Sequence, residues 1–118
     1  MGNVQKTYAL VIGVVALLVG ILGLLPAYST LILGIFGVNL LQTLVHLLTG
    51  VTGIYAGTKG DARTFNPVLG WAALILGIGA FIPGISGLLV NLLNVNTSVN
   101  VLHLLVGLIT LGVVYWAK

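Results

Sequence analysis

Two histidines, His46 and His103, are the residues of this 118-residue chain best suited to chemistry, because each sits inside a long apolar run. Around each histidine, polar residues and glycines recur at steps of three, four and seven residues, which places them on one face of an α-helix. In helices this apolar, such a face is expected to point into a bundle and away from lipid. The two sets are Asn39, Thr43, His46, Gly50 and Gly53, and Asn96, Asn100, His103, Gly107 and Thr110.

Three interpretations of the histidine pair are open. In the preferred one the polar side chains hydrogen-bond between helices, the glycines allow close approach, and no cofactor is needed. In the second, His46 and His103 bind a tetrapyrrole, because neutral imidazole ligates haem and helix bundles build such sites from facing helices. One shared haem, or a chlorophyll-type pigment on each histidine, fits this pattern. In the third, the pair lies on a path for protons or small solutes.

An enzyme is not expected from these residues. The one acidic residue, Asp61, lies between Lys59 and Arg63, as a solvated loop charge does. The chain has no cysteine, and paired carboxylates, a Ser–His–acid set and a phosphate-binding loop are all missing. Two histidines alone make an incomplete zinc site. Neither a catalytic residue nor a metal site is therefore predicted.

The chain overlies itself at an offset of 57 residues, which is the spacing between its two histidines. The same offset pairs Pro26 with Pro83 and aligns serine, threonine, asparagine and several glycines with their own kind. Composition bias aligns leucines, but it does not align rare residues at one offset. The pattern indicates a tandem duplication, with a first repeat at about 7–57 and a second at about 64–114.

Composition places the chain in a bilayer. Hydrophobic residues make up 59% and charged residues only 4%, whereas soluble domains carry about 25% charged residues. The net charge of +3 rests on so few residues that no clustered basic face for nucleic acid is predicted. Lipid is therefore the expected surrounding of most of the surface.

Four apolar runs approach the ~20 residues that cross the hydrocarbon core of a bilayer. These predicted spans are residues 7–25, 39–56, 65–82 and 96–116. Two shorter apolar runs, 27–38 and 84–95, are predicted to be surface-lying or partly re-entrant connectors. Proline ends a helix, so Pro26 and Pro83 mark the ends of the first and third spans.

The first and third predicted spans each have a smooth face of small residues. These are Gly13, Ala16, Gly20 and Gly23 in the first, and Gly70, Ala73, Gly77 and Ala80 in the third. Small residues let membrane helices approach closely. Packing inside one bundle is preferred over contact with a second subunit, and Gly50 and Gly107 are assigned the same packing role.

The distribution of charge predicts an orientation. Lys6, Lys59, Arg63 and Lys118 all fall on one side of a four-span arrangement, and the opposite connectors carry no charge. The positive-inside rule then places both termini and the central loop in the cytoplasm. Each repeat holds an even number of spans, so both repeats share one orientation. Their symmetry axis is expected to run along the membrane normal.

Two stretches of the chain carry a further signal: residues 33–50, which include Asn39 and His46, and residues 95–107, which include Asn96 and His103. They resemble the two signatures of a family of small four-span bacterial membrane proteins catalogued as domain of unknown function 4383. One departure is Gln42-Thr43, where members of the family often carry a His-Asn pair. A cofactor site that needs a second ligand from this span is therefore less well supported. The resemblance implies the four-span fold and implies no activity.

Taken together, the sequence predicts an all-α integral membrane protein with four transmembrane helices, arranged as two tandem helical hairpins related by a pseudo-two-fold axis. The predicted location is the bacterial cytoplasmic membrane or a thylakoid-type inner membrane. The predicted role is structural or accessory, alone, as a homo-oligomer, or as a subunit of a larger membrane complex. Tetrapyrrole binding through His46 and His103 is the alternative, and a pathway for protons or small solutes in an oligomer is the third hypothesis.

Overall fold

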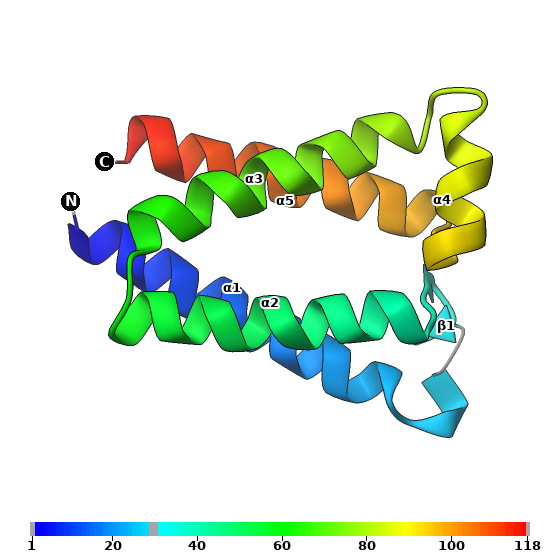
Figure 1. Cartoon of the computed structure of the whole chain (residues 1–118), viewed down its shortest axis with the longest axis horizontal. Helices are drawn as coiled ribbons and strands as arrows, with labels where there is room; N and C mark the ends of the chain where they lie inside the picture. Colours follow the sequence, from blue (N-terminus) through cyan, green and yellow to red (C-terminus); the bar gives the residue numbers. More distant parts are fainter. Residues whose placement is uncertain (1, 29–30, 118) are drawn as a thin grey trace.

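Long helices running side by side dominate the computed structural model of the chain, which describes residues 2–28 and 31–117. The elements in chain order are α1 (Gly2–Gly23), the 3-10 helix η1 (Pro26–Tyr28), β1 (Leu31–Ile32), β2 (Phe36–Gly37), α2 (Leu40–Thr58), α3 (Ala62–Gly79), α4 (Ile85–Leu93) and α5 (Thr97–Trp116). The short helix α4 crosses one end of the long helices (Figure 1). The start of α1, the end of α5 and the α2–α3 turn lie at the other end.

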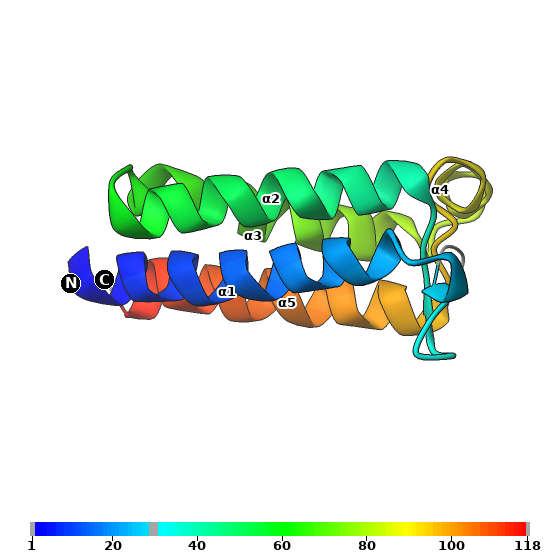
Figure 2. The same cartoon turned by 90° about the horizontal axis from the view of Figure 1, so that it is seen from below.

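The long helices form two antiparallel hairpins. Helix α1 packs along α2, and α3 packs along α5. The two hairpins lie next to each other, as the two perpendicular views show (Figures 1 and 2). A short turn joins them: α2 ends at Thr58, and Asp61 caps the start of α3. Segments far apart in sequence, such as α1 and α5, are thereby brought into one bundle.

Glycines set the distance between the helices of each hairpin. A Cβ atom added at Gly50 would lie 2.6 Å from the backbone nitrogen of Leu17, and one added at Gly107 would lie 2.6 Å from that of Leu74. On the facing helices, an added Cβ at Gly20 or Gly77 would meet a leucine side chain at 2.7 Å. The six glycines assigned to helix packing therefore lie at contacts inside the hairpins; Gly13 faces Gly53 and Ile54 on α2, and Gly70 faces Thr110 and Leu111 on α5.

Large apolar side chains cover the outside of the molecule, and the interior is built from small or polar ones. Leu48 and Val68 are 66% and 65% exposed, whereas Ala9 and Asn66 are fully buried. This is the reverse of a soluble domain, in which leucine and isoleucine fill the core. Three helices are long and apolar enough to cross a membrane: Val4–Gly23, Leu40–Thr58 and Thr97–Trp116.

The third predicted span, 65–82, differs from the helix that forms there. Helix α3 runs from Ala62 to Gly79 and does not reach the apolarity of the other three. The first turns of α3 contain Arg63, Asn66 and Pro67, at positions where a membrane span needs apolar residues. The capping carboxylate of Asp61 moves the start of the helix back to Ala62. Length and composition alone thus support three spans among the described residues, where the sequence predicted four.

The two connectors, predicted to be alike, fold differently. The first contains a β-hairpin that pairs Leu31 with Gly37 and turns through Leu33 and Gly34, both with positive φ. The second contains the nine-residue helix α4, which starts after Gly84 at a φ of 88°. Glycine adopts such backbone angles at little cost. The two connectors thus place their positive-φ residues at different points: Leu33 and Gly34 in the first, and Gly84 and Asn94 in the second.

Candidate ligand cavity between the hairpins

A cavity of about 380 Å³ lies between the two hairpins. All four long helices and the β-hairpin connector contribute to its wall. The polar side chains in this wall are His46, Gln42 and Thr49 from α2 and His103 from α5. The remaining side chains are aliphatic, apart from Phe36. The cavity is partly open to the surroundings, and its volume falls in the ~300–1,000 Å³ range of small-molecule sites.

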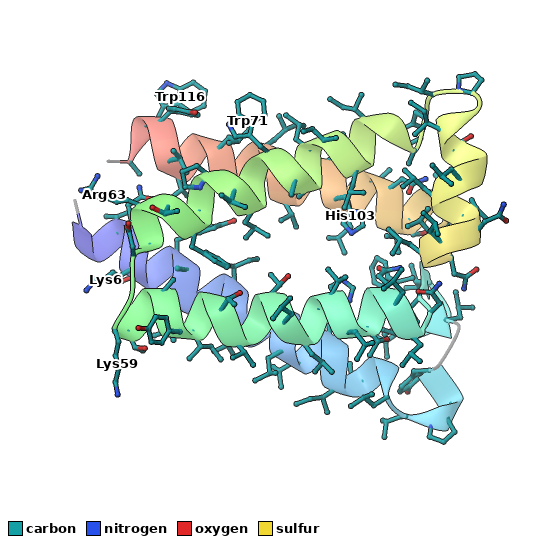
Figure 3. The ribbon with its side chains drawn as sticks, viewed as in Figure 1. Lys6, Lys59, Arg63, Trp71, His103 and Trp116 are labelled. Carbon is teal, nitrogen blue, oxygen red and sulfur yellow. The ribbon has the colours of Figure 1, made fainter. Side chains whose placement is uncertain are left out.

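The two histidines approach this cavity from different hairpins. The ring of His103 projects from α5 into the space between α5 and α2 (Figure 3). His46 lines the same cavity from α2, and its Nδ1 is enclosed by protein without a hydrogen-bond partner. Within residues 2–28 and 31–117, no hydrogen bond to protein is formed by either ring. The expected bonds to asparagine, threonine or backbone oxygens are therefore not made in this part of the chain.

The other members of the two predicted polar faces do not line the cavity. Thr43 and Asn100, which occupy equivalent positions, are buried. Thr43 Oγ1 and Asn100 Oδ1 have no hydrogen-bond partner in the described structure. Thr43 packs against Gly23 of α1, inside its own hairpin. A helical face is wide enough for neighbouring positions to turn toward different helices, which is why the histidines reach the cavity and these residues do not.

Asn39 and Asn96 each perform two tasks at the start of a helix. Their side-chain oxygens accept from the backbone nitrogens of Gln42 and Val99, so they are the N-caps of α2 and α5 rather than members of the helices. Their side-chain nitrogens donate to the opposite half of the chain. Asn39 Nδ2 donates to Leu92 O at 2.7 Å, and Asn96 Nδ2 donates to Ile35 O at 2.8 Å. These two bonds map onto each other at the 57-residue offset.

Two more amides complete a group that we name the connector clasp, defined as Asn39, Gln42, Asn94 and Asn96. Gln42 Nε2 donates to Gly37 O at 3.1 Å and to Leu93 O at 2.7 Å. Asn94 Nδ2 donates to Val38 O at 2.8 Å. The connector clasp joins the two hairpins at the end of the cavity nearest to α4. Gln42 therefore bonds to backbone carbonyls on both connectors.

A second polar group, which we name the terminal clasp, joins the hairpins at the opposite end; the sequence analysis had singled out only its Thr110. It consists of Gln5, Tyr8, Asn66 and Thr110. Asn66 Nδ2 donates to Gln5 O at 3.0 Å and to Gln5 Oε1 at 2.9 Å. Gln5 Nε2 donates to Val113 O at 2.9 Å, and Tyr8 and Thr110 share a hydroxyl–hydroxyl hydrogen bond. Buried amides inside apolar helices were the available signal.

The charged side chains lie away from the cavity. Lys6, Lys59 and Arg63 gather at the end of the molecule where α1 starts and α2 meets α3 (Figure 3). Asp61 stands in the same turn, and a side-chain hydrogen bond from Thr64 holds the pKa of its carboxyl below the usual value, with further help from backbone N–H groups and the charge of Arg63. No charged side chain is among the residues that line the cavity.

The chemistry available to the cavity is that of two neutral imidazoles in an apolar wall. A neutral imidazole offers one N–H donor and one acceptor nitrogen. Nδ1 of His46 is enclosed without a hydrogen-bond partner among the described residues, so Nε2 is the nitrogen through which this ring can bond to an occupant of the cavity. No group of three metal-ligating side chains occurs among the described residues.

These features define a small protein with membrane-like apolar helices and an internal cavity. A family model matches residues 6–116, which is nearly the whole chain, and the chain belongs to that family, described as Domain of unknown function (DUF4383). The resemblance seen in the sequence is thereby confirmed. No curated protein and no solved structure shows a significant similarity to the chain.

Proposed function

We propose that the chain is a four-span protein of the bacterial cytoplasmic membrane, or of a thylakoid-type inner membrane, with both termini cytoplasmic. Helix α3 is the fourth span, because it runs beside α5 along the length of the bundle (Figure 1). Support for the orientation comes from Lys6, Lys59 and Arg63, which lie at one end, whereas the two connectors at the other end carry no charge. A cysteine at Ser86 should react with an impermeant reagent added to intact cells, and a cysteine at Gly60 should not. Reaction of the Gly60 cysteine alone would show that the protein has the opposite orientation.

The reciprocal bonds of Asn39 and Asn96 support two hairpins related by a two-fold axis. In a two-fold contact, residue i of one half meets residue j of the other, and the reverse pair also occurs. Asn39 meets Leu92, and Asn96 meets Ile35, which is such a pair at the 57-residue offset. The glycine–leucine contacts inside the hairpins repeat at the same offset. A tandem duplication accounts for both sets of contacts.

The function of this arrangement is to hold a small, uncharged, mostly apolar molecule in the cavity between the hairpins. The observation that carries this proposal is the pair of histidines at equivalent positions, which line one cavity and bond to no described residue. Most of the wall is aliphatic, so an apolar occupant is stabilised there by burying this surface.

The groups around the cavity fit a ligand that contains no metal better than one that contains a metal. A histidine that ligates a metal normally donates its other N–H to a carbonyl, a carboxylate or water. Nδ1 of His46 is enclosed without such a partner. No cationic side chain lines the cavity to pair with the carboxylates of a haem. Both points favour a neutral, metal-free ligand over haem, and the first point also disfavours a chlorophyll-type pigment on His46.

The protein acts in an accessory role, holding its ligand without catalysis of its own, either alone, as a homo-oligomer, or beside other membrane subunits. The hydroxyl of Thr49 and the two imidazoles line the cavity, but no carboxylate lines it to activate them. The purely structural role keeps support from the two clasps, which provide the hydrogen bonds between helices that it requires. The structural role does not explain the cavity or the two histidines in its wall that bond to no described residue.

Mass spectrometry of small molecules extracted from the purified full chain tests the proposal. Ala72 lines the cavity from α3, so Ala72→Phe should fill part of it and remove the bound molecule. Ile75, on the same helix, is 64% exposed and outside the cavity, so Ile75→Phe is the matched control. Wild type and control should release a compound that Ala72→Phe lacks. Identical extracts from all three would refute the proposal, and a Soret or red chlorin absorption band would establish a tetrapyrrole instead.

A further inference from the structure

We propose that the molecule held between the hairpins is a quinone, with its two-carbonyl ring between His46 and His103 and its apolar tail extending toward the bilayer. This inference rests on the proposed function and specifies its ligand. Three features of the cavity carry it: the absence of charge in the wall, the symmetry of the two donors, and the volume. Each restricts the ligand independently of the other two.

The wall restricts the charge of the ligand. A buried charge without a partner is strongly disfavoured in an apolar surrounding. No lysine, arginine, aspartate or glutamate lines this cavity. Lipid phosphates, carboxylates and ammonium groups would therefore lie among aliphatic side chains without compensation. The ligand has to be neutral and soluble in the membrane.

The histidines restrict its polar groups. His46 can donate to an occupant through Nε2, because its Nδ1 is enclosed by protein. His103 occupies the equivalent position in the other hairpin and projects into the same space (Figure 3). In the proposed complex each histidine donates one N–H, and two donors from different hairpins suit a ligand that has two equivalent acceptors on opposite sides. The carbonyl oxygens of a 1,4-quinone accept hydrogen bonds and have this arrangement.

The volume restricts the size of the part that is enclosed. About 380 Å³ is near the lower limit for small-molecule sites, so it suits one substituted ring and the first part of its tail. The cavity is partly open, and the surrounding helix faces are apolar. A longer isoprenoid or alkyl tail can then continue into lipid.

Calorimetric titration of the full chain in lipid nanodiscs, with empty nanodiscs as the blank, tests this inference. The two probes are decyl-1,4-benzoquinone and decylbenzene, which share the tail and differ in the carbonyls. Wild type should bind the quinone about ten- to a hundredfold more tightly than decylbenzene, because each of two net hydrogen bonds between neutral groups contributes about three- to tenfold. His46→Phe and His103→Phe keep a flat ring and remove the donor. Each should weaken quinone binding about three- to tenfold and leave decylbenzene binding unchanged.

The possible outcomes distinguish an error in the identity of the ligand from an error in the binding site. Equal affinity of wild type for both probes would overturn the quinone and needs no variant to be folded. If Ala72→Phe weakened both probes in that case, the cavity would still be a binding site for another neutral molecule. Unchanged quinone affinity in both histidine variants would also overturn the inference. If neither probe bound to wild type, the quinone inference would fall, and the extraction experiment alone would decide on the cavity.

Discussion

The connector clasp can be broken without removing the helix caps that it shares. Asn39→Asp and Asn96→Asp retain the side-chain oxygen that caps α2 or α5, since aspartate caps helices as well as asparagine does. Each change removes the Nδ2 donor that bonds across to the other hairpin at 2.7 or 2.8 Å. Each also places a carboxylate beside a backbone carbonyl. The variants therefore test the bond between the hairpins and not the caps.

The expected loss is about 1 kcal/mol in the free energy of unfolding for each variant, since a net hydrogen bond contributes about 0.5–1.5 kcal/mol. The double variant should lose about 2 kcal/mol. Asn91 supplies the matched control, because it is an exposed asparagine in α4 at the same end of the molecule. Asn91→Asp adds the same charge and should change stability by less than about 0.5 kcal/mol.

The assay is denaturant unfolding of the full chain in mild detergent at neutral pH and again below about pH 4. A protonated aspartate regains one O–H donor, so the loss should shrink as pH falls through the ordinary aspartate pKa of about 3.9. If both single variants unfolded like Asn91→Asp, the clasp would not hold the hairpins together. A loss in one variant only would contradict the two-fold relation between the halves.

Other outcomes follow from the helix contacts, the charged turn and the cavity. Gly50→Ala and Gly107→Ala should each lower the free energy of unfolding by about 1–3 kcal/mol, because the added methyl meets backbone atoms at 2.6 Å. Gly87→Ala is the control, since its methyl meets nothing within 4 Å. Unfolding curves that are the same for all three variants would refute this. The pKa of Asp61 is lowered in the folded state, so its capping contribution to stability is present above pH ~4 and is lost as pH falls through the folded pKa. Asp61→Asn should therefore flatten this part of the curve of stability against pH. Nitrogen-15 NMR should find His46 neutral and protonated at Nε2, and a proton on Nδ1 would contradict the donor assignment.

Much of the helical framework could be predicted from the sequence, because apolar runs of nearly 20 residues leave few alternatives in a bilayer. The predicted starts at Asn39 and Asn96 were one residue early, since these side chains cap the helices from outside. The connectors could not be predicted, because their course depends on a few residues with positive φ, and two of these, Leu33 and Asn94, are not glycines. The two connectors have nearly the same length and apolarity, and a hydropathy profile contains no information about backbone angles.

The candidate site was predictable in part. The spacing around His46 and His103 placed both on inward faces, but it did not tell which neighbouring helix each position meets. The terminal clasp lies where the repeat breaks down: Asn66, Gln5 and Thr110 correspond to Ala9, Ala62 and Gly53 at the 57-residue offset. A list of mismatches between the repeats, rather than of matches, would have identified these residues.

The same comparison explains why the cavity lies where it does. At the terminal end the halves have diverged, so that Tyr8 meets Thr110 on one side, while Phe65 approaches Gly53 on the other. Unlike side chains can interlock across a two-fold axis and close the space between the hairpins. In the cavity, residues at equivalent positions of the two repeats line one space: His46 and His103, and the small side chains Ala16 and Ala73. The two alanines are too short to fill the space between the hairpins, so a gap remains there. A molecule that fills this gap meets a histidine from each hairpin, which is why a ligand with two equivalent acceptors fits it best.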